Sequence, residues 1–217
     1  MRRLWLGKRL LEMNRNMIAA LYVEKDGAYA GLEGIDLWDI ERDARKYDGP
    51  YPVVAHPPCN TWSVMAYVVE KKVGIRVGDD GGCFASALAA VRRCGGVLEH
   101  PKGTTAWRTF GLSKPFGGCW EQMLDGSWVT EVAQRNYGHP ATKRTWLYYV
   151  GKTEPAPMDW RTPDAPLAVC GHDARSEKSP MRRLFGAEAI HTPVKFRDAL
   201  LSLASLAQDE MKGEGGK

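Results

Sequence analysis

The chain has 217 residues, which is long enough for one well-packed domain and short for two. Its hydrophobic content of 44% and charged content of 26% are ordinary for a soluble globular protein, and its formal net charge of +4 permits a nucleic-acid partner without requiring one. No apolar run approaches the roughly 20 residues that cross a bilayer, so we expect no membrane partner.

Residues 1–16 are basic and too polar for a signal peptide, so we interpret them as an N-terminal extension. The five cysteines are odd in number, widely spaced and without a C-x-x-C pair, a pattern typical of reduced thiols. We therefore expect a cytoplasmic protein. A single catalytic domain is predicted over residues 17–210, with a disordered tail at 211–217.

Hydrophobic patterns along the chain predict an alternation of strands and helices. Apolar or alternating runs predict strands at 18–23, 34–39, 52–56, 97–101, 128–134 and 145–150. Helices are predicted at 40–47, 83–93, 104–112 and 196–206. Residues 151–180 are rich in Pro, Asp and Ser, lack a period, and predict a long loop. Strand, helix and strand over residues 52–101 indicate a right-handed parallel crossover, hence an α/β fold.

The stretch after the strand at 52–56 carries the first candidate for chemistry. Pro57 and Pro58 stop the strand, and Cys59 follows at once. Glu99 lies in the next predicted strand, just before the His100-Pro101 pair that breaks it. Because ligands of open α/β sheets bind at the carboxyl ends of the strands, we expect Cys59 and Glu99 to lie close together at one edge.

A cysteine and a glutamate at one sheet edge suit covalent catalysis. The thiolate adds to an electrophilic carbon while the acid protonates the ring that carries it. Lys143, after the turn His139-Pro140, would add a cation near the same edge. Each residue alone also has a structural interpretation: a buried inert thiol, a structural ion pair and a solvated lysine. Their combination favours a functional site.

Four segments resemble, in order, motifs of the DNA cytosine-C5 methyltransferases. Residues 56–63, His-Pro-Pro-Cys-Asn-Thr-Trp-Ser, resemble the Pro-Pro-Cys nucleophile loop, and residues 99–103 are similar to the Glu-Asn-Val loop. Residues 137–145 resemble the Tyr-Gly-x-Pro-Gln-x-Arg-x-Arg strand entry. Residues 183–189 resemble the segment after the target-recognition region.

This resemblance implies a Rossmann-like, methyltransferase-type mixed sheet, mostly parallel, with a C-terminal antiparallel hairpin and flanking helices. It implies that Cys59 adds to C6 of a flipped-out cytosine, that Glu99 engages N3 and that Lys143 approaches O2. The same motifs supply the expected substrate-binding residues: Pro57, Pro58, Asn60, Trp62, His100 and Thr145.

The chain also departs from the family pattern. The family's S-adenosylmethionine loop, Phe-x-Gly-x-Gly-Gly, corresponds to residues 21–27, which lack those glycines. The candidates for cofactor binding are Tyr22, Glu24, Asp36 and Asp39. The target-recognition region shrinks to residues 151–180. This layout resembles reduced, phage-type proteins acting in a bacterial cytoplasm.

The principal expectation is a DNA cytosine-modifying enzyme that acts through Cys59 and does not require S-adenosylmethionine. One alternative is an ordinary S-adenosylmethionine-dependent C5 methyltransferase, and another is an enzyme acting on a free nucleotide. A third is a zinc or iron enzyme, because His56, His100 and His139 each precede a proline. The last is an inactive module that only binds DNA. The sequence leaves the transferred group and the oligomeric state open.

Overall fold

A computed structural model describes residues 17–63, 66, 70–71, 74, 76–161, 167–170 and 181–212, with side chains up to residue 208. The N-terminal extension predicted at 1–16 lies outside the described residues, as do residues 213–217 of the predicted tail. Residues 211 and 212 belong instead to the last helix.

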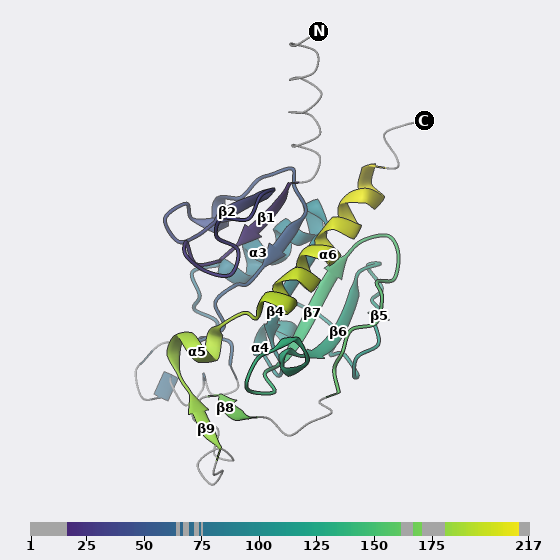
Figure 1. Cartoon of the computed structure of the whole chain (residues 1–217). Helices are drawn as coiled ribbons and strands as arrows, with labels where there is room; N and C mark the ends of the chain where they lie inside the picture. Colours follow the sequence, from purple (N-terminus) through teal and green to yellow (C-terminus); the bar gives the residue numbers. More distant parts are fainter. Residues whose placement is uncertain are drawn as a thin grey trace.

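A mixed sheet of seven strands forms the centre of the described fold (Figure 1), in the order β2-β1-β3-β4-β7-β6-β5. The strands are β1 (Ile18–Leu21), β2 (Ile35–Trp38), β3 (Val53–Ala55), β4 (Gly96–Pro101), β5 (Glu121–Gln122), β6 (Trp128–Ala133) and β7 (Arg144–Val150). β2, β1, β3 and β4 pair in parallel, and β7, β6 and β5 continue the sheet antiparallel. The predicted α/β, Rossmann-like fold with an antiparallel hairpin is confirmed.

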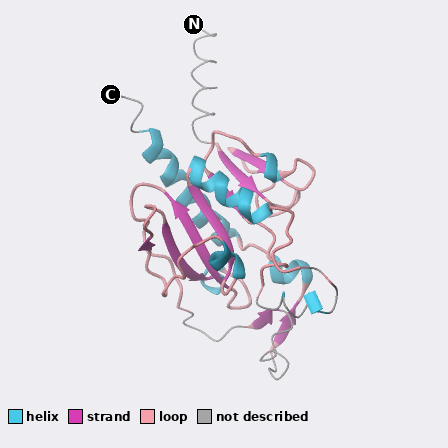
Figure 2. Cartoon of the chain, turned by 180° about the vertical axis from the view of Figure 1, so that it is seen from behind, coloured by secondary structure: helices cyan, strands magenta, loops and turns pink. Residues whose placement is uncertain are grey.

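Helices cover both faces of this sheet (Figures 1 and 2). α3 (Cys83–Cys94) packs on one face and α6 (Val194–Lys212) on the other. Short elements complete the main unit: η1 (Ala44–Lys46), α4 (Thr105–Thr109) and η2 (Gln134–Tyr137). A second, two-stranded sheet of β8 (Ala168–Cys170) and β9 (Arg182–Leu184) precedes α5 (Gly186–Ile190).

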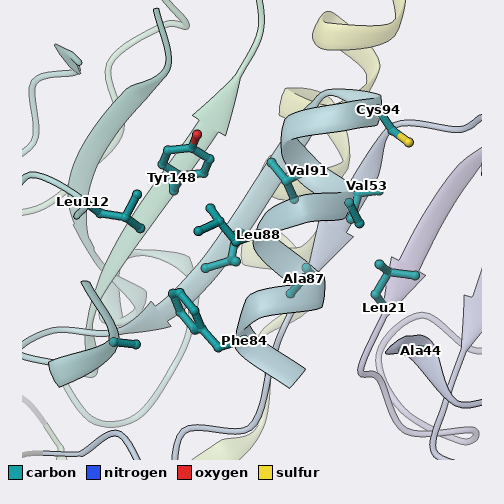
Figure 3. Packing of buried hydrophobic residues seen from close by; sticks show 14 of the residues in the cluster. Leu21, Ala44, Val53, Phe84, Ala87, Leu88, Val91, Cys94, Leu112 and Tyr148 are labelled. Atoms are coloured by element: carbon teal, nitrogen blue, oxygen red, sulfur yellow. The ribbon is translucent and has the colours of Figure 1, made fainter. Parts of the chain in front are cut away.

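Alternation along the strands explains the two helical layers. Val53 and Leu98 face the cluster of α3, which includes Phe84 and Leu88 (Figure 3). The neighbouring residue Val97 faces the cluster of α6 instead. Successive side chains of a strand point to opposite faces, so strands covered on both sides are apolar throughout. That is why residues 53–55 appear in the sequence as an uninterrupted apolar run.

Several predicted elements differ from the structure. The helix predicted at 40–47 is only the short η1, because Asp43 adopts a left-handed φ of 55°. The helix predicted at 104–112 ends at Thr109, just before Gly111 with its φ of 70°. The unstructured loop predicted at 151–180 is wrong at β8, which forms by pairing with the distant β9. The sequence patterns also missed β5, β9 and α5.

Searching the described residues for a helix long and apolar enough to cross a membrane finds none.

The β3–β4 pairing predicts a strong requirement for glycine at position 96. Gly96 has φ 112°, and a Cβ there would lie 2.0 Å from the Val53 carbonyl oxygen. We expect Gly96→Ala to lower the free energy of unfolding by at least about 3 kcal/mol in urea denaturation. Gly111→Ala is the matched control, because its φ is also positive but nothing lies within 4 Å of the added Cβ. It should cost only roughly 1–2 kcal/mol; equal losses for both variants would contradict this reasoning.

Candidate active site

Strand pairing brings Cys59, Glu99 and Lys143 to the same edge of the sheet. β3 and β4 are adjacent and parallel, with Ala55 opposite Leu98, so Glu99 is the first residue of β4 beyond its pairing with β3. Cys59 lies four residues beyond Ala55 in the loop that leaves β3. Thr145 of β7 pairs antiparallel with Pro101, which sets Lys143 just outside the same edge. The expected arrangement of Cys59 and Glu99 at one edge is confirmed.

The Glu99 carboxylate is held between two nitrogen atoms. One oxygen lies 3.1 Å from His56 Nδ1, and the other accepts a hydrogen bond from Gln134 Nε2 at 3.1 Å. Burial raises the pKa of Glu99, but the hydrogen bond and charge of His56 and the charge of Lys143 outweigh it, so the pKa lies below its ordinary value. The resting site therefore contains a carboxylate.

The hydrogen bonds continue on both sides of Glu99. The Tyr29 hydroxyl lies 2.9 Å from His56 Nε2, and Tyr29 is only 2% exposed. On the other side, Gln134 Nε2 also donates to Thr145 Oγ1 at 2.9 Å. We name these five residues the Glu99 network. Sequence reasoning missed Tyr29 and Gln134, because they come from a loop and a 3-10 helix that carry no motif.

The Cys59 thiol is protonated in the resting site. Burial raises its pKa above the ordinary value, and the negative charge of Glu99 raises it further. The positive charge of Lys143 acts in the opposite direction but does not compensate. The nucleophile is the thiolate, not the thiol. Cys59 must therefore lose its proton after a substrate binds and before it attacks.

Lys143 is anchored by the end of α5. Its Nζ donates to the carbonyl oxygens of Ile190 at 2.8 Å and His191 at 2.9 Å. Burial lowers its pKa, while the charges of Glu99, Cys170 and Cys59 raise it. A lysine ammonium has three donors, so one remains for a group in the site. The role of α5 in holding this lysine has no signal in the sequence.

The loop residues expected to bind substrate divide into buried and exposed positions. Pro57 is buried, whereas Pro58 and Asn60 are exposed beside Cys59. Trp62 is buried, and its Nε1 donates to Asp80 at 2.8 Å. Trp62 therefore fixes the loop after Cys59 to the start of α3.

The two strand residues of the expected substrate-binding set are fully buried. His100 Nδ1 lies 2.7 Å from Thr104 Oγ1, and burial lowers the pKa of His100 to about 4. Thr145 bonds to Gln134 within the Glu99 network. Both side chains are engaged by protein groups and support the residues around Glu99.

The expected cofactor residues do not fit S-adenosylmethionine. Tyr22 adopts a left-handed φ of 60°, where the family has glycines, and its ring packs against the core while its hydroxyl bonds to Ser86 of α3. Asp36 accepts hydrogen bonds from Trp38 and Arg42.

The other two acidic candidates are no better suited. Asp39 is buried and accepts from the Arg42 backbone at 3.0 Å, and Glu24 is exposed in a turn. A bulky ring thus replaces the glycine turn, and the carboxylates of Asp36 and Asp39 are already bonded.

The three histidines do not form a metal site. His56 belongs to the Glu99 network, His100 bonds to Thr104, and His139 Nδ1 lies 3.0 Å from backbone atoms of Ala141. Within the described ranges, no group of three or more His, Cys, Asp or Glu side chains is arranged to hold a metal ion. The positions of these histidines therefore give no support to the zinc or iron alternative.

A cavity of about 670 Å³ lies at the opposite end of the sheet. Its lining includes Arg92, Asp125, Tyr148 and Lys152, near the start of β4 and the end of β7. It is therefore separate from the edge that carries Cys59.

Comparisons of the chain with protein-family models, with curated proteins and with solved structures found no match.

The charges around Cys59 predict opposite effects of two substitutions on its alkylation by iodoacetamide. Glu99→Gln should move the alkylation midpoint to lower pH, because it removes a negative charge that raises the Cys59 pKa. Lys143→Met should move it to higher pH. Peptide mass spectrometry across a pH series measures both, with the exposed Cys119 as internal reference. A Cys59 midpoint that neither substitution moves would contradict the proposed proximity.

Because residues 21–27 lack the family's glycines, we expect isothermal titration calorimetry to detect no micromolar binding of S-adenosylmethionine. In the same segment Tyr22, in the left-handed region, packs its ring against the core. Tyr22→Phe, which removes only the hydroxyl bonded to Ser86, should behave in the same way. Clear micromolar binding by the unaltered protein would restore the methyltransferase alternative.

Proposed function

We propose that the protein modifies a pyrimidine base, cytosine in DNA, through covalent addition of Cys59 to C6 of the ring. The observation that carries this proposal is the placement of a thiol, a carboxylate and a lysine, all partly buried, at one sheet edge, each within range of the charges of the others. An inert structural thiol has no need of such partners.

The roles follow from the chemistry of a pyrimidine. Cytosine is a poor electrophile until a proton or a hydrogen bond at N3 withdraws electrons from the ring. Glu99 is suited to this position, because it is held rigidly by His56 and Gln134. The remaining donor of Lys143 is suited to O2. Addition of Cys59 at C6 then makes C5 nucleophilic, ready to react with an electrophile.

Basic residues at the same edge support a polyanionic substrate. Lys102, after β4, and Arg144, at the start of β7, both bond to the buried Glu131, at 2.9 and 2.6 Å. Their side chains remain 41% and 35% exposed. Arg144 and Arg161 also lie 5.9 and 5.3 Å from the ring of Trp160. Phosphates and stacked bases are the groups that such a surface binds.

The test is exchange of the hydrogen at C5 of cytosine for deuterium in D2O, which requires addition at C6 but no group donor. We expect exchange in a single-stranded oligonucleotide, measured by mass spectrometry of the nucleosides. Cys59→Ala should abolish it. Glu99→Gln should slow it by about 10²–10⁴-fold, the usual contribution of a positioned acid.

Cys170→Ser is the matched control, because this second thiol also interacts with the charge of Lys143 and should be dispensable. Exchange in free dCMP but not in the oligonucleotide would contradict a DNA substrate. DNA binding without any exchange would indicate the inactive binding module.

A further inference from the structure

The proposed reaction needs a source for the proton at N3, and the inference that follows rests on the proposed function. Cytosine carries no proton at N3, while both oxygens of the Glu99 carboxylate already accept hydrogen bonds. The amide of Gln134 cannot release its proton. An imidazole can take up and release one near neutral pH, and His56 is the imidazole bonded to Glu99.

We propose that His56 is a proton-relay residue that supplies, through Glu99, the proton that cytosine N3 takes up when Cys59 attacks C6. His56 lies between Tyr29 and Glu99, at 2.9 Å from the hydroxyl and 3.1 Å from the carboxylate. The side chains of His56 and Glu99 are each only 13% exposed, so water has little access to either group.

The proton and electron movements balance. The Cys59 thiol first loses its proton to water, and the thiolate pair forms the bond from Sγ to C6. The C5=C6 pair becomes a C4=C5 bond, and the C4=N3 pair takes the proton from Glu99. Glu99 is a carboxylate at rest, so it receives this proton from Nδ1 of the doubly protonated His56, whose Nε2–H stays bonded to the Tyr29 oxygen. Elimination of the thiolate runs the same steps backwards.

The relay predicts a difference between two bases. Uracil already carries a proton at N3, and addition at its C6 places the negative charge on O4. A carboxylate at N3 suits uracil without any relay, whereas cytosine depends on it. A residue that only positions Glu99 would affect both bases to the same extent.

The experiment compares C5 hydrogen exchange in oligonucleotides that contain either cytosine or uracil. His56→Asn is the informative variant, because the asparagine amide nitrogen can replace Nδ1 as a donor to Glu99 but cannot relay a proton. We expect this variant to slow cytosine exchange by about 100-fold or more. Uracil exchange should stay within roughly threefold of the unaltered protein, since its N3 already holds a proton.

Equal slowing for both bases, or no slowing for either, would overturn the relay while leaving the proposed function intact. No cytosine exchange by the unaltered protein would overturn the proposed function and the relay with it. If His56→Asn does not fold, Tyr29→Phe takes its place. This variant removes the hydroxyl group that contacts His56 Nε2 and leaves the contact between His56 Nδ1 and Glu99 unchanged. It should also slow cytosine exchange selectively, and a loss shared by both bases would again overturn the relay.

Discussion

The carboxylate of Glu99, whose side chain is only 13% exposed, is the constraint on which this sheet edge depends. Removing a charged carboxylate from water costs several kcal/mol unless donors replace the lost hydration. Here the donors come from distant parts of the chain: His56 after β3 and Gln134 in η2. The parallel pairing of β3 with β4 and the antiparallel pairing of β4 with β7 bring these segments together. The same pairings carry Cys59 and Lys143 to the edge.

The small unit of β8, β9 and α5 is part of this arrangement. Ala168 of β8 bridges to Ala141, in the turn before Lys143, and the two pack with Leu184 in a small core of their own. α5 supplies the carbonyl groups that hold the Lys143 ammonium. The unit lies at the end of the sheet where β7 begins (Figure 1). Its position explains why a lysine with a depressed pKa remains oriented toward the site.

The sequence predicted the strands of the main sheet except β5, and the placement of Cys59 and Glu99 at one edge, because both depend on local signals. Apolar runs ended by prolines or followed by a helix are enough to place two adjacent parallel strands. The rest of the Glu99 network could not be predicted from the sequence, because Tyr29 reaches His56 and Gln134 reaches Glu99 only through long-range packing. β8 and β9 were missed for the same reason. His56 entered the sequence prediction only as a ligand in the metal alternative, because the sequence does not reveal that its ring faces the Glu99 carboxylate.

The resemblance to cytosine-C5 methyltransferases therefore separates into two parts. The strand ends carry Cys59, Glu99 and Lys143 within range of one another's charges, whereas Tyr22 packs against the core in a segment that lacks the family's glycines. Mass-spectrometric peptide mapping after incubation with DNA containing 5-azacytosine, which traps a thiol at C6 without a donor, tests the central claim most directly. We expect the modified base on the peptide that contains Cys59. An adduct on another cysteine, or none under conditions where the DNA is bound, would contradict the assignment of Cys59 as the nucleophile.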